Sequence, residues 1–264
     1  MISPERIISF IKSRGGSILP DISVYDSVSS TNTLLKAEAE KGAPHGRVII
    51  ARSQTAGRGR MGRSFYSPED TGLYVSILVR PDLSPDEIFF ITPLTAVACA
   101  RAIEASGCRK AELKWVNDIC VDKKKAAGIL VEGSFDPSGR VAYAVVGVGI
   151  NLYSPTGGFP DDIKDIACGA FDGVEEAVDR DRLIADLLCE FFELYADLPR
   201  HAFMDEYCDR SLIIGEMVTV THGENEYQGF AADIDDSAHL IVECDDGKRR
   251  AFHSGEARVR RKHK

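Results

Sequence analysis

Three arginines lie among glycines in one short stretch, where residues 57–63 read GRGRMGR. The spacing fits the dinucleotide fingerprint G-x-G-x-x-G, but that fingerprint requires an α-helix to begin inside it. Here the chain continues as SFYSP, a poor helix start. We therefore predict a flexible cationic loop, whose glycines let the backbone fold over a ligand while Arg58, Arg60 and Arg63 bind phosphate or carboxylate oxygens. A solvated turn is the plain alternative, and the neighbouring QTA and FY sequences disfavour it.

Four further stretches carry chemically useful residues, and each also has a purely structural explanation. The SSTN of residues 29–32 can cap a helix, contact a ligand, or do both. The ND of residues 117–118 is a common turn pair, and the GVG of residues 147–149 can simply end a strand. Within the lysine run 123–125 a solvated turn explains the first two members. Lys125 differs because it abuts a strand.

These stretches resemble the sequence blocks of biotin–protein ligases, whose signature loop is similar to SQTAGRGRMGR at residues 53–63. Four other blocks fall in that family's order: SSTN at 29–32, KWVND at 114–118, KAAGILVE at 125–132 and GVGIN at 147–151. Together they span most of residues 25–155, and GEARVR at 255–260 resembles the family's C-terminal segment. The family usually has Pro where Val116 stands, and Val can adopt the same backbone φ.

The resemblance implies that the protein activates biotin with ATP to biotinyl-adenylate. It then acylates a lysine of a biotin carboxyl carrier protein, with Mg²⁺ bridging the phosphates. Lys125, Arg60 and Asp118 are implied as catalytic residues, with Asp118 on the metal side. The implied biotin and nucleotide contacts are Ser30, Thr31, Asn32, Gln54, Gly57, Arg58, Gly59, Arg60, Arg63, Phe65, Lys114, Asn117, Asp118, Lys125, Gly128 and Asn151. The glycine–arginine loop is expected to cover the water-sensitive anhydride.

Composition restricts the partners. The net charge of −9 over 264 residues opposes binding to nucleic acid, and the basic tail (residues 258–264) is interpreted as a solvated terminus. Seven scattered cysteines without C-x-x-C indicate buried small hydrophobes rather than disulfides or zinc ligands. No apolar run approaches the roughly 18 residues of a membrane span, and the N-terminus lacks a signal-peptide layout. We therefore expect a cytoplasmic protein that uses no membrane.

The elements that must position these residues follow from periodicity and from start and stop signals. We predict helices at 3–14, 33–41, 182–198 and from Ser84 through about residue 102. Strands are predicted at 22–28, 48–51, 73–79, 111–115, 119–122, 126–135 and 141–149. After residue 209, short alternating strands at 217–221, 227–234, 239–243 and 248–252 predict a small barrel.

The resemblance implies an α+β protein with two domains. Residues 1–210 are expected to form a mixed β-sheet backed by helices, the class II aminoacyl-tRNA-synthetase-like fold of biotin and lipoate ligases. Residues 211–264 are expected to form an SH3-like β-barrel. The short N-terminal helix leaves no room for the winged helix of the family's regulatory members, so we expect an enzyme without repressor activity. Homodimerisation occurs in the family, and the sequence leaves it open.

Two other functions remain to be weighed. A lipoate ligase shares this chemistry, and the GRGR loop argues against it. A non-catalytic, biotin-responsive DNA-binding regulator belongs to another class, and the acidic charge opposes it.

Overall fold

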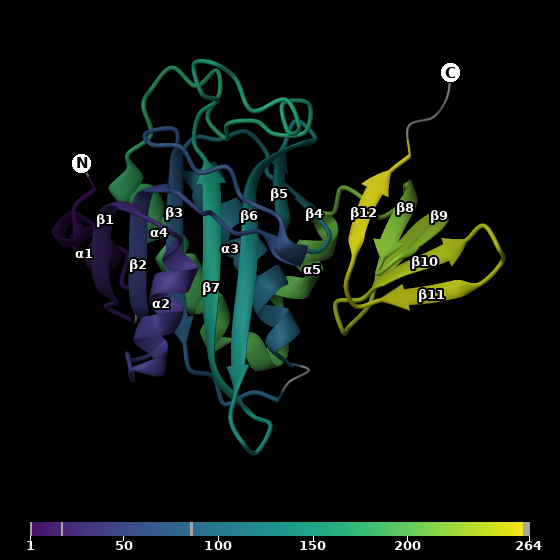
Figure 1. Cartoon of the computed structure of the whole chain (residues 1–264), viewed down its shortest axis with the longest axis horizontal. Coiled ribbons are helices and arrows are strands. Elements are labelled where there is room, and N and C mark those ends of the chain that lie inside the picture. The colour runs from purple at the N-terminus through teal and green to yellow at the C-terminus, as the bar shows by residue number, and fades with distance from the viewer. Residues whose placement is uncertain (1, 17, 85–86, 261–264) are drawn as a thin grey trace.

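The computed structural model describes residues 2–16, 18–84 and 87–260, and its larger part is built on one mixed sheet (Figure 1). The strand order is β1-β2-β3-β7-β6-β5-β4. Only β1 and β2 are parallel, and the other neighbours are antiparallel. The strands are β1 (Asp21–Val28), β2 (Arg47–Gln54), β3 (Gly72–Val79), β4 (Glu112–Lys114), β5 (Asp118–Val121), β6 (Lys124–Phe135) and β7 (Val141–Asn151). The predicted strands are thus confirmed, with small shifts at their ends.

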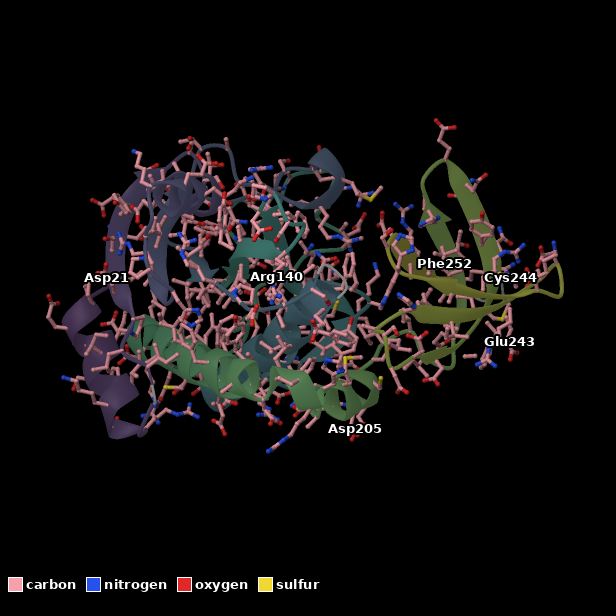
Figure 2. The ribbon with its side chains drawn as sticks, turned by 90° about the horizontal axis from the view of Figure 1, so that it is seen from below. Asp21, Arg140, Asp205, Glu243, Cys244 and Phe252 are labelled. Carbon is pink, nitrogen blue, oxygen red and sulfur yellow. The ribbon has the colours of Figure 1, made fainter. Side chains whose placement is uncertain are left out.

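Helices cover the two faces of this sheet unequally. The larger core lies on the face that packs against α1 (Pro4–Ser13), α3 (Ile91–Ala105), α4 (Arg180–Ala196) and α5 (Phe203–Asp209), which run together beneath the sheet (Figure 2). Of the helices in the described residues, only α2 (Thr31–Glu40) packs on the opposite face, over the small core of Leu35, Ala39, Ile49, Leu78, Tyr143 and Val145. Much of that second face is therefore left without a helix.

The helix α2 begins earlier than predicted. Ser30 is its N-cap, because the Ser30 hydroxyl accepts a hydrogen bond from the backbone N–H of Thr33 at 3.4 Å. The predicted start at residue 33 is wrong by two residues, so Thr31 and Asn32 belong to the first helical turn. The N-terminus of α2, with the Thr31 and Thr33 N–H groups paired to side chains, therefore lies on the sheet face to which the described residues bring no other helix.

The helix predicted from Ser84 begins differently from the expectation. Pro85 and Asp86 lie outside the described residues; the 3-10 helix η2 (Glu87–Phe90) comes next, and α3 starts at Ile91. The stretch Glu87–Ala105 is long and apolar enough, by length and composition, to cross a membrane. The expectation that no such stretch exists is therefore wrong, but most of this one is buried inside the protein. It serves as the central core helix.

The C-terminal part is a five-stranded antiparallel sheet in the order β11-β10-β9-β8-β12 (Figure 1). Its strands are β8 (Met217–His222), β9 (Asn225–Ile234), β10 (Leu240–Cys244), β11 (Arg249–Phe252) and β12 (Glu256–Val259). The four predicted strands are confirmed, whereas β12, α5 and the 3-10 helices η1 (Arg60–Gly62) and η3 (Leu198–Arg200) were not predicted. Within the basic tail, Arg258 and Arg260 pair with Glu256 and Asp245. Residues 261–264 lie outside the described residues.

Candidate functional site

A pocket with an empty volume of about 950 Å³, open to solvent, lies on the sheet face that carries α2. Successive residues of a strand point to opposite faces, so positions 128 and 130 of β6 share this face with 147 and 149 of β7. At 147 and 149, glycines stand where side chains would otherwise fill the space. A Cβ at Gly147 would lie 2.3 Å from Asn32 Oδ1, and one at Gly149 would lie 2.7 Å from the Phe65 ring. The glycines therefore create the hollow.

One end of the pocket is lined by neutral polar side chains that bond to each other. The Ser76 hydroxyl lies 2.6 Å from Asn32 Oδ1 and 2.8 Å from Thr31 Oγ1. Gln54 Oε1 accepts from the backbone N–H of Thr31 at 2.9 Å, and Gln54 Nε2 donates to Ser67 Oγ at 3.0 Å. Ser30, Thr31 and Asn32 are at most 4% exposed. This end offers oriented donors and acceptors with no net charge.

The glycine–arginine loop folds back over the pocket as an irregular hairpin. The Gly59 N–H donates to Arg63 O at 2.7 Å, and the Phe65 N–H donates to Gly57 O at 2.9 Å. Its tip contains η1, in which Met61 has φ 55°. No α-helix begins between residues 57 and 72, so the dinucleotide-binding hypothesis is wrong. The predicted flexibility of the loop stays a prediction.

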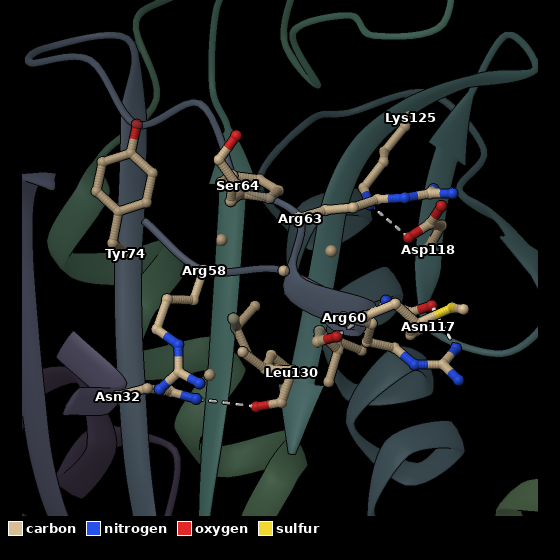
Figure 3. A pocket seen from close by; sticks show the side chains of 18 of the residues that line it. Asn32, Arg58, Arg60, Arg63, Ser64, Tyr74, Asn117, Asp118, Lys125 and Leu130 are labelled. Atoms are coloured by element: carbon tan, nitrogen blue, oxygen red, sulfur yellow. Dashed lines mark hydrogen bonds and ion pairs between the residues drawn. The ribbon is translucent and has the colours of Figure 1, made fainter. Parts of the chain in front are cut away.

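The other end of the pocket is charged. Lys125 Nζ lies 2.6 Å from Asp118 Oδ1 and 5.8 Å from the centre of the Phe65 ring. Arg60 Nη1 donates to Asn117 Oδ1 at 3.1 Å (Figure 3). Burial lowers the pKa of Arg60, against the opposing effect of the nearby Asp118 carboxylate. Because a partly buried guanidinium and a lysine both line this end, it is a site for anionic groups.

The C-terminal domain also reaches the pocket. Gly255 and Glu256 line it, and Arg63 Nη2 lies 2.5 Å from Glu256 Oε2. Burial raises the pKa of Glu256, but Arg63 and Arg258 outweigh burial and hold it at about 2. The Trp115 indole N–H donates to Ala238 O at 3.1 Å, which is a second contact between the larger sheet domain and the C-terminal domain. The loop is thus tied to both domains.

The structure brings nearly all expected contacts to one cavity: Ser30, Thr31, Asn32, Gln54, Arg58, Gly59, Arg60, Arg63, Phe65, Lys114, Asn117, Asp118, Lys125 and Gly128 line it. Gly57 and Asn151 do not. A Cβ at Gly57 would lie 2.4 Å from Phe65 O, so this glycine permits the hairpin to close. Asn151 is buried at the end of β7, where its carbonyl accepts from Ala170 N.

Several lining residues were not expected: Met61, Ser64, Tyr74, Trp115, Leu130 and Glu256. Tyr74 had a usable signal, because it is an aromatic hydroxyl within the aliphatic strand β3. Burial raises its pKa. Glu256 had none, because only the packing of the C-terminal domain brings it here. The peptide bond between Trp115 and Val116 is cis.

The charged end fits a magnesium ion carried by phosphates. Asp118 Oδ1 is buried and makes no hydrogen bond, the ion pair with Lys125 aside. Among the described residues no group of three or more His, Cys, Asp or Glu side chains is placed to hold a metal. Mg²⁺ is commonly bound by one or two carboxylates together with substrate phosphates, so the Asp118 carboxylate suits it once Lys125 moves to a phosphate oxygen.

Two family models match the chain. Residues 24–151 match the biotin/lipoate A/B protein ligase family, and residues 213–260 match the biotin protein ligase C terminal domain. The bifunctional ligase/repressor BirA of Bacillus spizizenii is 34% identical over 233 residues, which cover 86% of this chain and 70% of that protein. The biotin–[acetyl-CoA-carboxylase] ligase of Mycobacterium tuberculosis is 32% identical, with 86% and 85% covered.

Solved structures agree with these matches. The biotin protein ligase of Aquifex aeolicus, in complex with biotin and ATP, superposes with a TM-score of 0.75 at 26% identity. The match covers 91% of this chain and 99% of that one.

Proposed function

The chain belongs to the biotin protein ligase family and carries out ATP-dependent biotinylation, and we propose that its acceptor is a lysine of a biotin carboxyl carrier domain. One observation carries the assignment of roles. A single pocket has a neutral, hydrogen-bonded end and a cationic end, and a glycine–arginine loop lies across both. Biotin has a neutral ureido ring, and its carboxylate must meet the phosphates of ATP. The two ligands together therefore require a neutral end next to a cationic end.

The neutral end is proposed to bind the biotin ring system. Biotin offers one carbonyl acceptor and two N–H donors, and Thr31, Asn32 and Gln54 present both donors and acceptors within one network. Leu130 and the Phe65 ring supply apolar wall for the tail. A buried polar site of this kind rejects ligands that leave its groups unpaired.

In the first half-reaction the biotin carboxylate attacks the α-phosphorus of ATP and pyrophosphate leaves. Lys125 and Arg60 are proposed to hold the reacting phosphate oxygens and balance the charge that grows on them. Lys125 can do this by exchanging Asp118 for a phosphate oxygen, since both partners are anionic. A magnesium ion held by Asp118 would neutralise charge on the phosphates.

In the second half-reaction the neutral amine of the carrier lysine attacks the carbonyl of the mixed anhydride, and AMP leaves. The loop is proposed to exclude water from the anhydride until the carrier arrives, with Arg60 as its covering side chain. Asp118 is proposed to orient the incoming amine as well.

The remaining proposals concern the setting of the reaction. We propose that the domain boundary lies near residue 210 and that the protein is cytoplasmic. We also propose that the acidic chain does not bind nucleic acid. Homodimerisation occurs in the family, so a second copy of the chain is a further proposed partner.

A mass measurement tests the function directly. The purified protein is mixed with biotin, Mg-ATP and a biotin carboxyl carrier domain, and the carrier is weighed. The proposal expects a gain of one biotinyl group that requires ATP and is absent when the acceptor lysine is replaced by arginine. An unmodified carrier contradicts it. Lipoate in place of biotin discriminates the related enzyme, because preferential gain of a lipoyl group would reassign the pocket.

A further inference from the structure

A carboxylate that does not line the pocket sits directly behind its neutral end. Glu132 lies on β6, on the same sheet face as Leu130 and opposite Val145 of β7. Its side chain is only 14% exposed. A largely buried carboxylate is costly unless cations and donors surround it, so its neighbours indicate its purpose.

Three groups from two separate segments meet at Glu132. Arg58 of the loop places Nη1 at 3.1 Å from Oε1 and 3.3 Å from Oε2. On α2, Lys36 Nζ lies 3.2 Å from Oε1, and the Asn32 amide nitrogen donates to Oε2 at 3.0 Å. Glu132 therefore joins the glycine–arginine loop to the first turns of α2 through one pair of oxygens.

The contact fixes which way the Asn32 amide faces. A carboxylate only accepts hydrogen bonds, so Asn32 must turn its nitrogen toward Glu132 and Leu130 O. Its oxygen then faces the Ser76 hydroxyl at 2.6 Å, and through Ser76 the Thr31 hydroxyl. Glu132 therefore sets the orientation of the Asn32 amide and, through it, of the Ser76 and Thr31 hydroxyls.

The contact also fixes where the loop lies. In Figure 3 the Arg58 side chain descends from the loop toward Asn32 and Leu130, across the neutral end of the pocket. Within the described residues, Glu132 is the carboxylate that pairs with Arg58. Its loss would leave two cations, Arg58 and Lys36, near each other without their counter-charge.

We propose that Glu132 is a positioning residue for biotin, which acts through Arg58 and Asn32. Its carboxylate seats the loop over the neutral end and sets the amide that reads the ureido ring. The inference rests on the proposed function, because it presumes that this end binds biotin. Glu132 does not reach the charged end, so the chemical step proceeds without it.

The test compares Glu132→Gln with the intact enzyme in adenylate formation and adenylate release. Glutamine keeps the shape, loses the charge that pairs with Arg58 and Lys36, and replaces one acceptor oxygen with a donor, so both effects of Glu132 are weakened. We expect the KM for biotin and the rate of adenylate release without carrier each to rise about tenfold. The KM for ATP and kcat at saturating biotin should stay within about twofold, because the charged end is untouched.

Two other variants make the result decisive. Glu132→Asp keeps the charge and acceptor oxygens, so it should recover most of the biotin affinity. Glu243→Gln replaces an exposed carboxylate on the C-terminal sheet (Figure 2) and should match the intact enzyme. Unchanged biotin KM and adenylate release in Glu132→Gln would overturn the proposal. So would an equal loss in every kinetic constant, together with a lower unfolding temperature, in both Glu132 variants. If the intact protein forms no adenylate, the proposed function fails instead.

Discussion

The two ends of the pocket satisfy their polar groups in opposite ways. At the neutral end, Thr31, Asn32 and Ser76 are almost fully buried and bond to one another, and the Asn32 amide also donates to Glu132 behind them. At the charged end, Lys125 and Asp118 are 31% and 21% exposed, and they form an ion pair. The first arrangement is closed and specific, whereas the second is open to solvent and to replacement by another anion.

This difference separates recognition from chemistry. A buried network of neutral hydrogen bonds penalises any ligand that leaves one of its members unpaired, so it determines affinity and selectivity. A partly solvated ion pair costs little to exchange, so Lys125 can leave a carboxylate for a phosphate. Substitutions at the charged end should therefore change rates, and substitutions at the neutral end should change binding.

The largest effect is expected at the charged end. Lys125→Ala removes one preorganised cation from the reacting phosphate, which should slow adenylate formation by about a hundredfold, on the order of 3 kcal/mol. The biotin KM should change little. Pyrophosphate release in a single turnover measures the step, and Lys124→Ala, at an exposed neighbour on the same strand, is the matched control. Near-normal adenylate formation in Lys125→Ala would remove the lysine from the mechanism.

The next effect concerns the cover over both ends. Arg60→Gly removes a half-buried guanidinium that bonds to Asn117, so the loop should hold the adenylate less well. We expect adenylate escape to rise at least about tenfold, measured as biotin attached to bystander proteins. Arg109→Gly, at an exposed arginine paired with Asp122, is the control. Bystander labelling equal to that of the intact enzyme would contradict a covering role.

A smaller effect should appear at the neutral end. Gly147→Ala places a Cβ 2.3 Å from Asn32 Oδ1, so the amide must move away from Ser76. The biotin KM should rise about tenfold, while the KM for ATP stays within about twofold. Gly157→Ala has no atom within 4 Å of its added carbon and should leave both constants unchanged. A change confined to the KM for ATP would reverse the assignment of the two ends.

The sequence predicted elements and site residues well where local chemistry decides them. The Asp122-Lys123 turn joins β5 to β6, and both residues have positive φ, as a tight hairpin turn requires. The blocks that resemble the family converge on one cavity because strands β2, β5, β6 and β7 end or run beside it.

Interactions between distant segments were beyond this reasoning. Glu256 follows Arg63 by 193 residues, and nothing near either residue indicates their ion pair. The strand β12 that carries Glu256 is short and charged, so its alternation is weak, and it is stabilised by pairing with β8. In the sequence, Glu132 is likewise a single charge within an apolar strand. Its ion pair with Lys36 forms only because α2 packs against this strand.

The smallest effect tests whether the C-terminal domain is held to the charged end of the pocket by an electrostatic contact. The pKa of Glu256 is held at about 2, below its ordinary value of 4.5, so its ionised form stabilises the folded state. That stabilisation is complete above about pH 4.5 and is lost as the pH falls toward about 2. Since the Arg63 side chain is 60% exposed, we expect the ion pair to add only about 0.5–1 kcal/mol to the free energy of unfolding, or roughly 2 °C to the unfolding temperature.

Glu256→Gln should therefore unfold about 2 °C below the intact protein at pH 7, and this difference should disappear near pH 2. Thermal unfolding across that range measures it, with Glu243→Gln as the exposed control. A difference that does not depend on pH would mean that the side chain matters here through packing, and that the domain contact is not electrostatic.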